Sequence, residues 1–158
     1  MTRTVNIVDS IPPLIALSGN ASITLECHDS FTDPGAIATD TCAGTFNATA
    51  SGIVDPNTPG TYTLTYTATD SSGNTAVPVT RTVNVVDTTK PTITLNGAAA
   101  VTVECHTTYT DAGATASDIC DGDLSGAIVA VNSVNANTPG AYSVTYSVSD
   151  AAGKPPTR

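Results

Sequence analysis

The stretch Arg81–Gly97, RTVNVVDTTKPTITLNG, decides the architecture of the chain. Thr82–Val86 is rich in β-branched residues, and Thr92–Leu95 alternates polar and apolar side chains, so both segments are predicted to be strands. The residues between them, Asp87–Pro91, end in a proline, which cannot donate a hydrogen bond to a central ladder. The pattern predicts a strand, a short polar linker and a second strand, and we interpret the linker as a joint between two domains.

The same joint occurs once before in the chain. Thr2–Asp9 reads TRTVNIVD and matches Thr80–Asp87, TRTVNVVD, at a constant offset of 78 residues. Self-similarity at a fixed period is the signature of tandem repeats, so two domains are predicted. Residues 1–9 are interpreted as an N-terminal strand equivalent to the final strand of a sandwich, followed by domain 1 at residues 10–88 and domain 2 at residues 89–158.

The composition argues against several classes of protein. Fourteen Asp and Glu against five Lys and Arg give a net charge of −9, whereas binding to nucleic acid needs clustered cations. No segment approaches the run of about 18 apolar residues that a membrane span requires. Met1 leads directly into strand-like sequence without a signal peptide, which suggests a processed or excised piece. We expect no nucleic-acid partner and no membrane insertion.

Alternation with a period of two predicts an all-β fold. Tyr62, Leu64, Tyr66 and Ala68 share one face of the clearest strand, and Tyr142–Val148 repeats the pattern in domain 2. Short strands with frequent turn signals are typical of an immunoglobulin-like sandwich. The predicted fold class is therefore all-β, with two tandem immunoglobulin-like β-sandwich domains, the second lacking its own final strand.

The four cysteines form two equivalent pairs, Cys27/Cys42 and Cys105/Cys120, each 15 residues apart. We expect one disulfide per repeat and hence an oxidising, extracellular or cell-surface location. Four buried, reduced thiols are the simpler alternative. Zinc is a third possibility because His28 and His106 each follow the first cysteine, although adjacent residues on a strand point to opposite faces.

Several acidic residues are predicted to converge at the joints. If the first two strands of each domain form a hairpin, the second strand returns to the joint, where the sixth strand also ends. The expected set in domain 2 is Asp87, Glu104 and Asp150, with Asp118 brought near through its neighbouring cysteine, and in domain 1 it is Asp9, Glu26, Asp70 and Asp40. Convergent carboxylates suit calcium, a hard ion that prefers oxygen ligands. The alternative is that these residues accept backbone N–H bonds in turns.

Four segments carry a resemblance to a known family: VVDTTKPTITLNG, ATASDICDGDLSG, NTPGAYSVTYSVSDAAGK and TRTVNVVD. They resemble the bacterial immunoglobulin-like surface repeats that are related to hyalin repeats and to the Ig-like modules of some crystal toxins. The resemblance implies tandem modules in secreted and cell-surface proteins, where they form stalks and adhesion arms. Domain 1 departs from the pattern, because Ala43-Gly44-Thr45 replaces Asp121-Gly122-Asp123.

Two functions follow as hypotheses, and neither is enzymatic. No serine elbow or glycine-rich phosphate loop is present, and a histidine repeated in both domains is more often structural than catalytic. The first hypothesis is a structural module, stiffened by calcium, in a stalk or filament. The second is an adhesin that binds a glycan or protein through its loops, although the loops are short and most aromatic residues are placed as core.

The ends of the chain suggest how a filament would form. Domain 2 stops before its final strand, which leaves a sheet edge open to a strand from elsewhere. The missing strand has a counterpart at the other end of the molecule, Thr4, Val5, Asn6, Ile7 and Val8. The expected partner is therefore either another copy of this chain, added head to tail by strand donation, or the neighbouring repeats of a longer chain.

Overall fold

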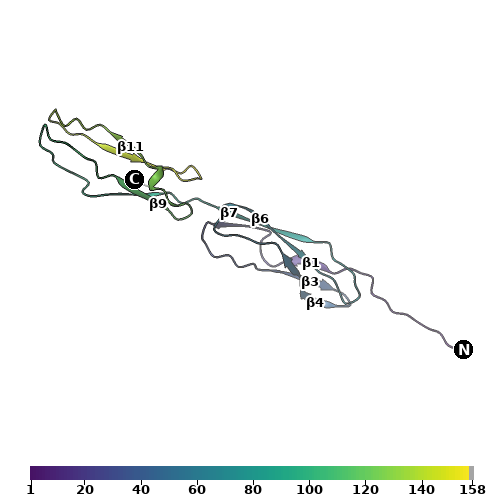
Figure 1. Cartoon of the computed structure of the whole chain (residues 1–158). Helices are drawn as coiled ribbons and strands as arrows, with labels where there is room; N and C mark the ends of the chain where they lie inside the picture. Colours follow the sequence, from purple (N-terminus) through teal and green to yellow (C-terminus); the bar gives the residue numbers. More distant parts are fainter. Residues whose placement is uncertain (157–158) are drawn as a thin grey trace. The chain divides into compact units, whose positions relative to one another are not determined.

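The computed structural model describes residues 1–156 and divides into two compact units, Met1–Val86 (unit 1) and Asp87–Arg158 (unit 2) (Figure 1). Its regular elements are strands, apart from one turn of 3₁₀ helix, so the prediction of an all-β fold is confirmed. Within the described residues, no helix has the length and hydropathy needed to cross a membrane.

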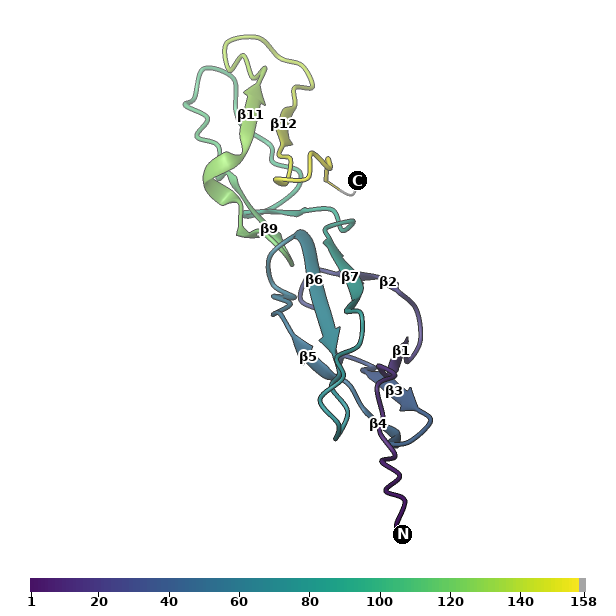
Figure 2. The same ribbon diagram turned by 90° about the vertical axis from the view of Figure 1, so that its right-hand side faces the viewer.

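Unit 1 contains two sheets (Figure 2). The first has the strand order β1-β3-β4 and the second has the order β2-β7-β6-β5. The strands are β1 (Leu14–Leu17), β2 (Ser22–Glu26), β3 (Ala36–Asp40), β4 (Gly44–Asn47), β5 (Thr49–Ser51), β6 (Gly60–Thr67) and β7 (Val79–Val86).

The core of unit 1 lies between these sheets. The alternation read from the sequence places Leu64 and Tyr66 of β6 inward, and they pack with Ile15 of β1 and with Ala36 and Ala38 of β3. The small alanines of β3 leave room for the large Tyr66 ring, which is fully buried. The apolar face predicted for β6 is therefore the core face.

β1 and β2 run in the same direction, which corrects the predicted hairpin. β2 pairs in parallel with β7, with Ser22 opposite Thr82 and Glu26 opposite Val86. Because β7 runs toward the joint at Asp87, β2 must run toward it as well. The bend at Ser18-Gly19 thus carries the chain from one sheet to the other without reversing it.

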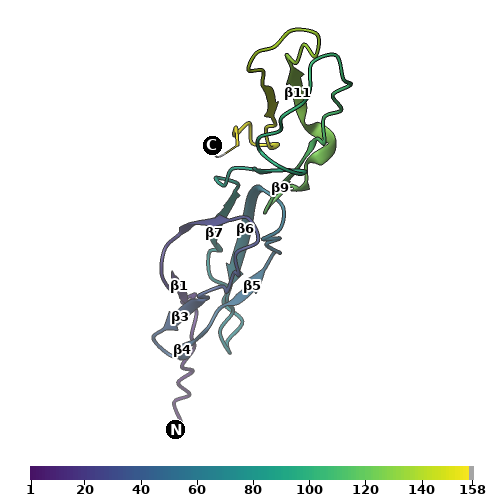
Figure 3. The same cartoon turned by 90° about the vertical axis from the view of Figure 1, so that its left-hand side faces the viewer.

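Unit 2 repeats this plan with fewer strands (Figure 3). One sheet has the order β10-β9-β8, and the other is a single antiparallel pair, β11-β12. The elements are β8 (Thr92–Leu95), β9 (Ala114–Asp118), β10 (Gly122–Asp123), the 3₁₀ turn η1 (Ser125–Ala127), β11 (Val129–Asn132) and β12 (Val144–Ser147).

The described part of unit 2 contains no counterpart of β2 or β7. Val101 and Val103 correspond to Ile23 and Leu25 of β2, yet they belong to no strand and are exposed. β2 is hydrogen-bonded to β7 alone in its sheet, so a segment of the same pattern without that partner has no ladder to join.

Residues 1–9, predicted to be a strand, have no strand assignment in the structure. The segment runs away from the sheets of unit 1, and Val5, Ile7 and Val8 are exposed (Figure 2). A strand needs a partner strand for its backbone groups, and no strand of the described residues pairs with this segment. Its role as a donor strand stays a prediction.

Candidate functional site

Three buried aspartates meet in unit 2, at the end where the linker leads into its first strand. We call this end of each unit its linker pole and the opposite end its distal pole. Asp87, Asp118 and Asp150 are 9%, 8% and 6% exposed. One carboxylate oxygen from each lies within 4.8 Å of one from each of the others.

The strands of unit 2 deliver these side chains to one point. Asp118 ends β9, Asp150 follows β12, and Asp87 precedes β8. β9 is antiparallel to β8, so its end lies beside the start of β8, where the linker enters. The convergence of these three residues, predicted from the sequence, is present in the structure.

One oxygen of each turn aspartate holds the local backbone. Asp118 Oδ1 accepts the N–H of Cys120 at 2.8 Å and of Asp121 at 3.2 Å. Asp150 Oδ1 accepts the N–H of Lys154 at 2.6 Å. The turn role considered for these residues is therefore real, and it leaves the second oxygen of each carboxylate for other partners.

The second carboxylate oxygens of these aspartates determine what the cluster could bind. The hydroxyl of Thr89 donates to Asp87 Oδ1 at 3.0 Å or to Asp118 Oδ2 at 3.4 Å. Asp150 Oδ2 is buried and has no hydrogen-bond partner in the described structure. A buried carboxylate oxygen without a partner is costly, and two further buried carboxylates beside it add repulsion. Because all of these donors are oxygens, the cluster fits a hard divalent cation such as calcium.

Unit 1 has an equivalent cluster at its own linker pole. Asp9 and Asp40 offer carboxylate oxygens within 4.8 Å of each other and of the Cys42 sulfur. Asp40 Oδ1 accepts the N–H of Cys42 at 2.7 Å and of Ala43 at 2.8 Å. The Oδ2 atoms of Asp9 and Asp40 are buried without a partner in the described residues. The acidic surroundings, Asp9 above all, raise the pKa of the Cys42 thiol.

Asp70, the fourth residue predicted for this cluster, has its oxygens occupied. Its Oδ1 accepts the N–H of Ser72 at 2.9 Å and of Asn74 at 2.8 Å, and its Oδ2 accepts the Asn74 side-chain amide at 2.8 Å. Burial raises the pKa of Asp70, but the hydrogen bonds from Asn74, Ser72 and Gly73 outweigh burial and hold this pKa below its usual value. The same amide donates to the Asp9 carbonyl at 3.3 Å, which places Asp70 at the linker pole.

Glu26 and Glu104 were predicted in these clusters, and this prediction is wrong. Glu26 ends β2 beside Val86, at the distal pole of unit 1. Glu104 lies in the turn that meets the loop before β12, where the N–H of His106 donates to the Ala136 carbonyl at 2.8 Å, whereas Asp150 follows β12. Both errors come from the assumed hairpin, because a second strand that continues in the direction of the first ends at the distal pole.

The predicted disulfides within each repeat, Cys27–Cys42 and Cys105–Cys120, are also absent from the structure. Cys42 and Cys105 are free thiols, and Cys27 and Cys120 are the disulfide-bonded cysteines. In unit 1, Cys27 follows β2 at the distal pole and Cys42 follows β3 at the linker pole, so a short bridge cannot join them.

The structure gives little support for metal binding through cysteine sulfur or histidine imidazole. Cys120 lies within 4.8 Å of the carboxylates of Asp87 and Asp121, but its sulfur is in a disulfide and is no thiolate ligand. In residues 1–156 no histidine joins a group of three metal-ligating side chains, so His28 and His106 do not form the zinc site considered above.

A buried arginine in unit 1 was not predicted from the sequence. Arg81 of β7 is fully buried and forms an ion pair with Asp33. Its guanidinium also donates to the Tyr66 hydroxyl at 2.7 Å and to the carbonyls of Ser18, Asn20 and Gly35 at 2.6, 3.0 and 3.2 Å. The sequence signal was Arg81 itself, because it lies inside an otherwise apolar and threonine-rich strand. An arginine that is buried with its strand needs an acceptor.

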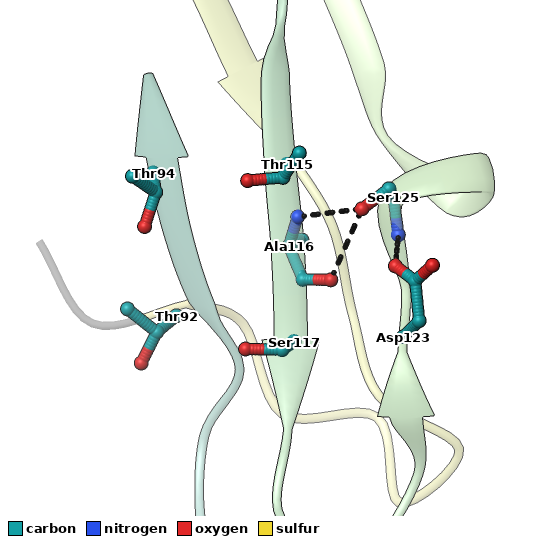
Figure 4. Close-up of a pocket in the computed structure, with 7 residues that line it drawn as sticks. All are labelled: Thr92, Thr94, Thr115, Ala116, Ser117, Asp123 and Ser125. Atoms are coloured by element: carbon teal, nitrogen blue, oxygen red, sulfur yellow. Dashed lines mark hydrogen bonds between the residues drawn. The ribbon is translucent and has the colours of Figure 1, made fainter. Parts of the chain in front are cut away.

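A concavity on the sheet β10-β9-β8 is the other candidate site (Figure 4). Its lining is made of small side chains, and the Ser125 hydroxyl bridges the backbone N–H and carbonyl of Ala116 at 3.1 and 3.3 Å. The lining residues are Thr92, Thr94, Thr115, Ala116, Ser117, Asp123 and Ser125. None of these seven residues supplies an aromatic ring on which a sugar could stack.

Comparisons with known proteins show which proteins this chain is similar to. Residues 15–85 and 93–158 each match the family described as "Bacterial surface protein, Ig-like domain". Hyalin of Strongylocentrotus purpuratus is 32% identical over 171 residues, which cover 96% of this chain but 13% of hyalin. The crystal structure of the lipoprotein BT2262 from Bacteroides thetaiotaomicron shares 32% identity, with a TM-score of 0.40, over 51% of this chain and 44% of that one.

The two family matches fall one on each unit, and together they span most of the chain. They confirm the resemblance read from the sequence and the predicted class of two tandem immunoglobulin-like domains. The chain belongs to the family of bacterial surface proteins with Ig-like domains.

Proposed function

We propose that this chain is a structural repeat segment of a surface protein, and that calcium bound by Asp87, Asp118 and Asp150 fastens the linker to unit 2. The observation that carries this proposal is the buried Oδ2 of Asp150, which has no hydrogen-bond partner in the described residues and faces two other buried carboxylates. A cation would compensate the three charges and complete the contacts of this oxygen.

The position of Asp87 gives the ion a mechanical role. Asp87 directly follows Val86, the last residue of β7. A cation held by Asp87, Asp118 and Asp150 would tie the residue that leaves the final strand of one repeat to two loops of the next. Load along the chain would then act on oxygen–cation contacts as well as on a five-residue polar linker.

The cluster of unit 1 is proposed as a weaker site. Asp9 and Asp40 each offer an oxygen without a partner, but both oxygens of Asp70 are engaged. The group in unit 1 contains two carboxylates and a thiol, whereas the group in unit 2 contains three carboxylates, so less negative charge is available to a cation in unit 1. Binding should therefore be tighter in unit 2 than in unit 1.

A structural role is favoured over adhesion or catalysis. The hydroxyl-lined concavity on β8, β9 and β10 lacks the exposed aromatic side chains that dominate binding hot spots. The acidic clusters sit at equivalent positions in both units, as expected for a feature of the repeat itself.

Thermal unfolding in calcium and in chelator tests the proposal. Extracellular modules bind calcium with dissociation constants of about 10⁻⁴ to 10⁻³ M, so 10 mM calcium should stabilise unit 2 by about 1.4–2.7 kcal/mol. At about 4–8 °C per kcal/mol, its melting temperature should rise by about 6–22 °C.

Asp150→Asn should abolish most of this rise, while its melting temperature in chelator should stay the same or increase because one of three buried like charges is removed. Asp123→Asn is the matched control, since Asp123 caps a turn of the same unit outside the cluster, and it should keep the full calcium response. Equal melting temperatures in calcium and chelator for the unmodified chain would refute the proposal.

A further inference from the structure

A turn of five residues follows β6 in unit 1 and β12 in unit 2, and it begins with an aspartate at the linker pole. Its sequence is DSSGN at residues 70–74 and DAAGK at residues 150–154. In both turns the N–H of the aspartate donates to the carbonyl of the fifth residue, at 3.0 Å in unit 1 and 3.2 Å in unit 2. The N–H of the fifth residue donates to Oδ1 of the aspartate, at 2.8 and 2.6 Å. The two turns share these backbone hydrogen bonds, so the clusters differ through their side chains.

In unit 1 the side chain of the fifth residue satisfies the aspartate. The Asn74 amide donates to Asp70 Oδ2 at 2.8 Å and to the Asp9 carbonyl at 3.3 Å. An asparagine side chain is short enough to fold back over its own turn, as asparagine often does in loops. The amide thus occupies the carboxylate oxygen that a cation would otherwise bind.

In unit 2 a lysine stands at the same position and leaves the aspartate unsatisfied. Asp150 is more than nine-tenths buried, and its Oδ2 has no hydrogen-bond partner in the described structure. The Lys154 ammonium forms no ion pair within residues 1–156. A lysine keeps its strongly hydrated ammonium in water and lays its methylene groups along the surface, whereas fixing the ammonium at a buried oxygen costs rotamer entropy and hydration. Asp150 Oδ2 therefore stays available to a cation from solution.

A second difference between the units fixes the turn of unit 2 in place. Asp121 Oδ2 accepts the N–H of Ala151 at 2.6 Å, which joins the loop after β9 to the turn after β12. Ala43 stands at this position in unit 1 and has no carboxylate to offer. Asp118 ends β9 and Asp150 begins the turn, so the contact made by Asp121 holds these two aspartates at a fixed separation without using their second oxygens.

We propose that the fifth residue of this turn decides whether the acidic cluster of a repeat binds a hard divalent cation. Asparagine closes the cluster with a neutral amide, and lysine leaves it open. Asp121 acts as a positioning residue, because it holds the turn of unit 2 where Asp150 faces the other carboxylates. Lys154 and Asp121 thereby set the affinity of the calcium site proposed above, on which this inference rests.

The size of the effect follows from what a cation must displace. Calcium could bind the aspartate of a turn closed by asparagine only by displacing a hydrogen bond to a carboxylate, which is stronger than one between neutral groups. In unit 2 no such bond has to be broken, since Asp150 Oδ2 has no partner among the described residues. An amide at position 154 should therefore weaken calcium binding about tenfold or more, and it should stabilise the turn in the absence of calcium.

Exchange of the fifth residue tests the proposal. Backbone amide shifts of residues 150–154 and 70–74, followed by NMR during a calcium titration of the 158-residue chain, measure binding at each cluster. Lys154→Asn should weaken binding to unit 2 about tenfold or more and raise its melting temperature in chelator. Lys154→Met is the matched control, because it also removes the charge but supplies no donor, and it should bind calcium at least as tightly as the unmodified chain. Asn74→Lys should tighten binding to unit 1.

Two substitutions of Asp121 test its positioning role in the same titration. Asp121→Ala removes the acceptor of the Ala151 N–H and should weaken calcium binding to unit 2. Asp121→Asn keeps an oxygen that can accept this N–H, and it should restore most of the binding. Equal loss in the two variants would show that the charge of Asp121 matters rather than its hydrogen bond, and would overturn the positioning role.

The outcomes separate this inference from the calcium site itself. An unmodified chain whose amides at residues 150–154 do not respond to calcium would overturn the site and the inference together. A response that Lys154→Asn leaves unchanged would overturn the role of the fifth residue and leave the site in place. Equal loss of binding in Lys154→Asn and Lys154→Met would overturn closure by the amide, because the methionine supplies none.

Discussion

Unit 1 and unit 2 share one sequence pattern, and among the described residues they differ in the presence of a final strand. With β7 in place, the segment around Ile23 and Leu25 pairs as β2, and Tyr66 is fully buried. Without a counterpart of β7 in the described residues, Val101 and Val103 are exposed, and Tyr146 is half-buried. The two segments have similar β propensity, so the comparison shows that a partner strand, rather than propensity, decides whether β2 forms.

The same comparison applies to the polar core. Desolvation, followed by the hydrogen bond to Asp33, raises the pKa of Tyr66 to about 12. The hydrogen bond to Asp111, followed by desolvation, raises the pKa of Tyr146 to about 12 as well. Both tyrosines therefore stay protonated and hold an aspartate, but only in unit 1 does an arginine of the described residues neutralise it. The final strand thus brings a charge to the core as well as apolar side chains.

The largest effect is expected when this charge is removed from unit 1. Arg81→Met should destabilise unit 1 by about 3 kcal/mol, because breaking a buried ion pair leaves the partner uncompensated. Urea denaturation of the reduced, dilute chain would measure this loss. Arg3→Met is a matched control in the same Thr-Arg-Thr-Val-Asn context, and in the monomer it should change stability by less than about 0.5 kcal/mol. Equal effects of the two substitutions would contradict the assigned role of Arg81.

A smaller effect is expected from a substitution that makes the acidic cluster of unit 1 resemble that of unit 2. Asn74→Ala removes the amide that donates to Asp70 Oδ2 and to the Asp9 carbonyl, and its expected cost in chelator is about 1–2 kcal/mol. The freed oxygen should make the melting of unit 1 more dependent on calcium than in the unmodified chain. Ser71→Ala, an exposed position in the same turn, is the control. An unchanged calcium response of Asn74→Ala would separate Asp70 from the cation site.

Much of the fold could be predicted because its signals are local. The alternation of Tyr62, Leu64 and Tyr66 and the repeated joint gave the strand class and the number of repeats. Asp87 and Asp150 could be placed together because Asp87 precedes a strand that begins at the linker pole and Asp150 follows a strand that ends there. Asp118 was expected there through its neighbouring cysteine, whereas the structure brings it there as the last residue of β9.

The rest depended on strand pairing over long sequence separations. The bend at Ser18-Gly19 carries the chain from one sheet to the other. From the sequence alone it looks the same as a turn that reverses the chain. This one ambiguity misplaced Glu26 and Glu104. The wrong cysteine pairs came from the equal spacing of 15 residues in both repeats, which does not show that Cys27 and Cys42 lie at opposite poles of unit 1. The acidic partner of Arg81 lies 48 residues away, and no local pattern identifies Asp33 as that partner.

A structure from crystals grown in millimolar calcium would test most directly whether the three aspartates of unit 2 bind this ion. We expect an ion at the linker pole of unit 2, bound to Asp150 Oδ2 at about 2.3–2.6 Å together with oxygens of Asp87 and Asp118. An ordered water or a protein donor on Asp150 Oδ2, with no cation among the three carboxylates, would contradict it.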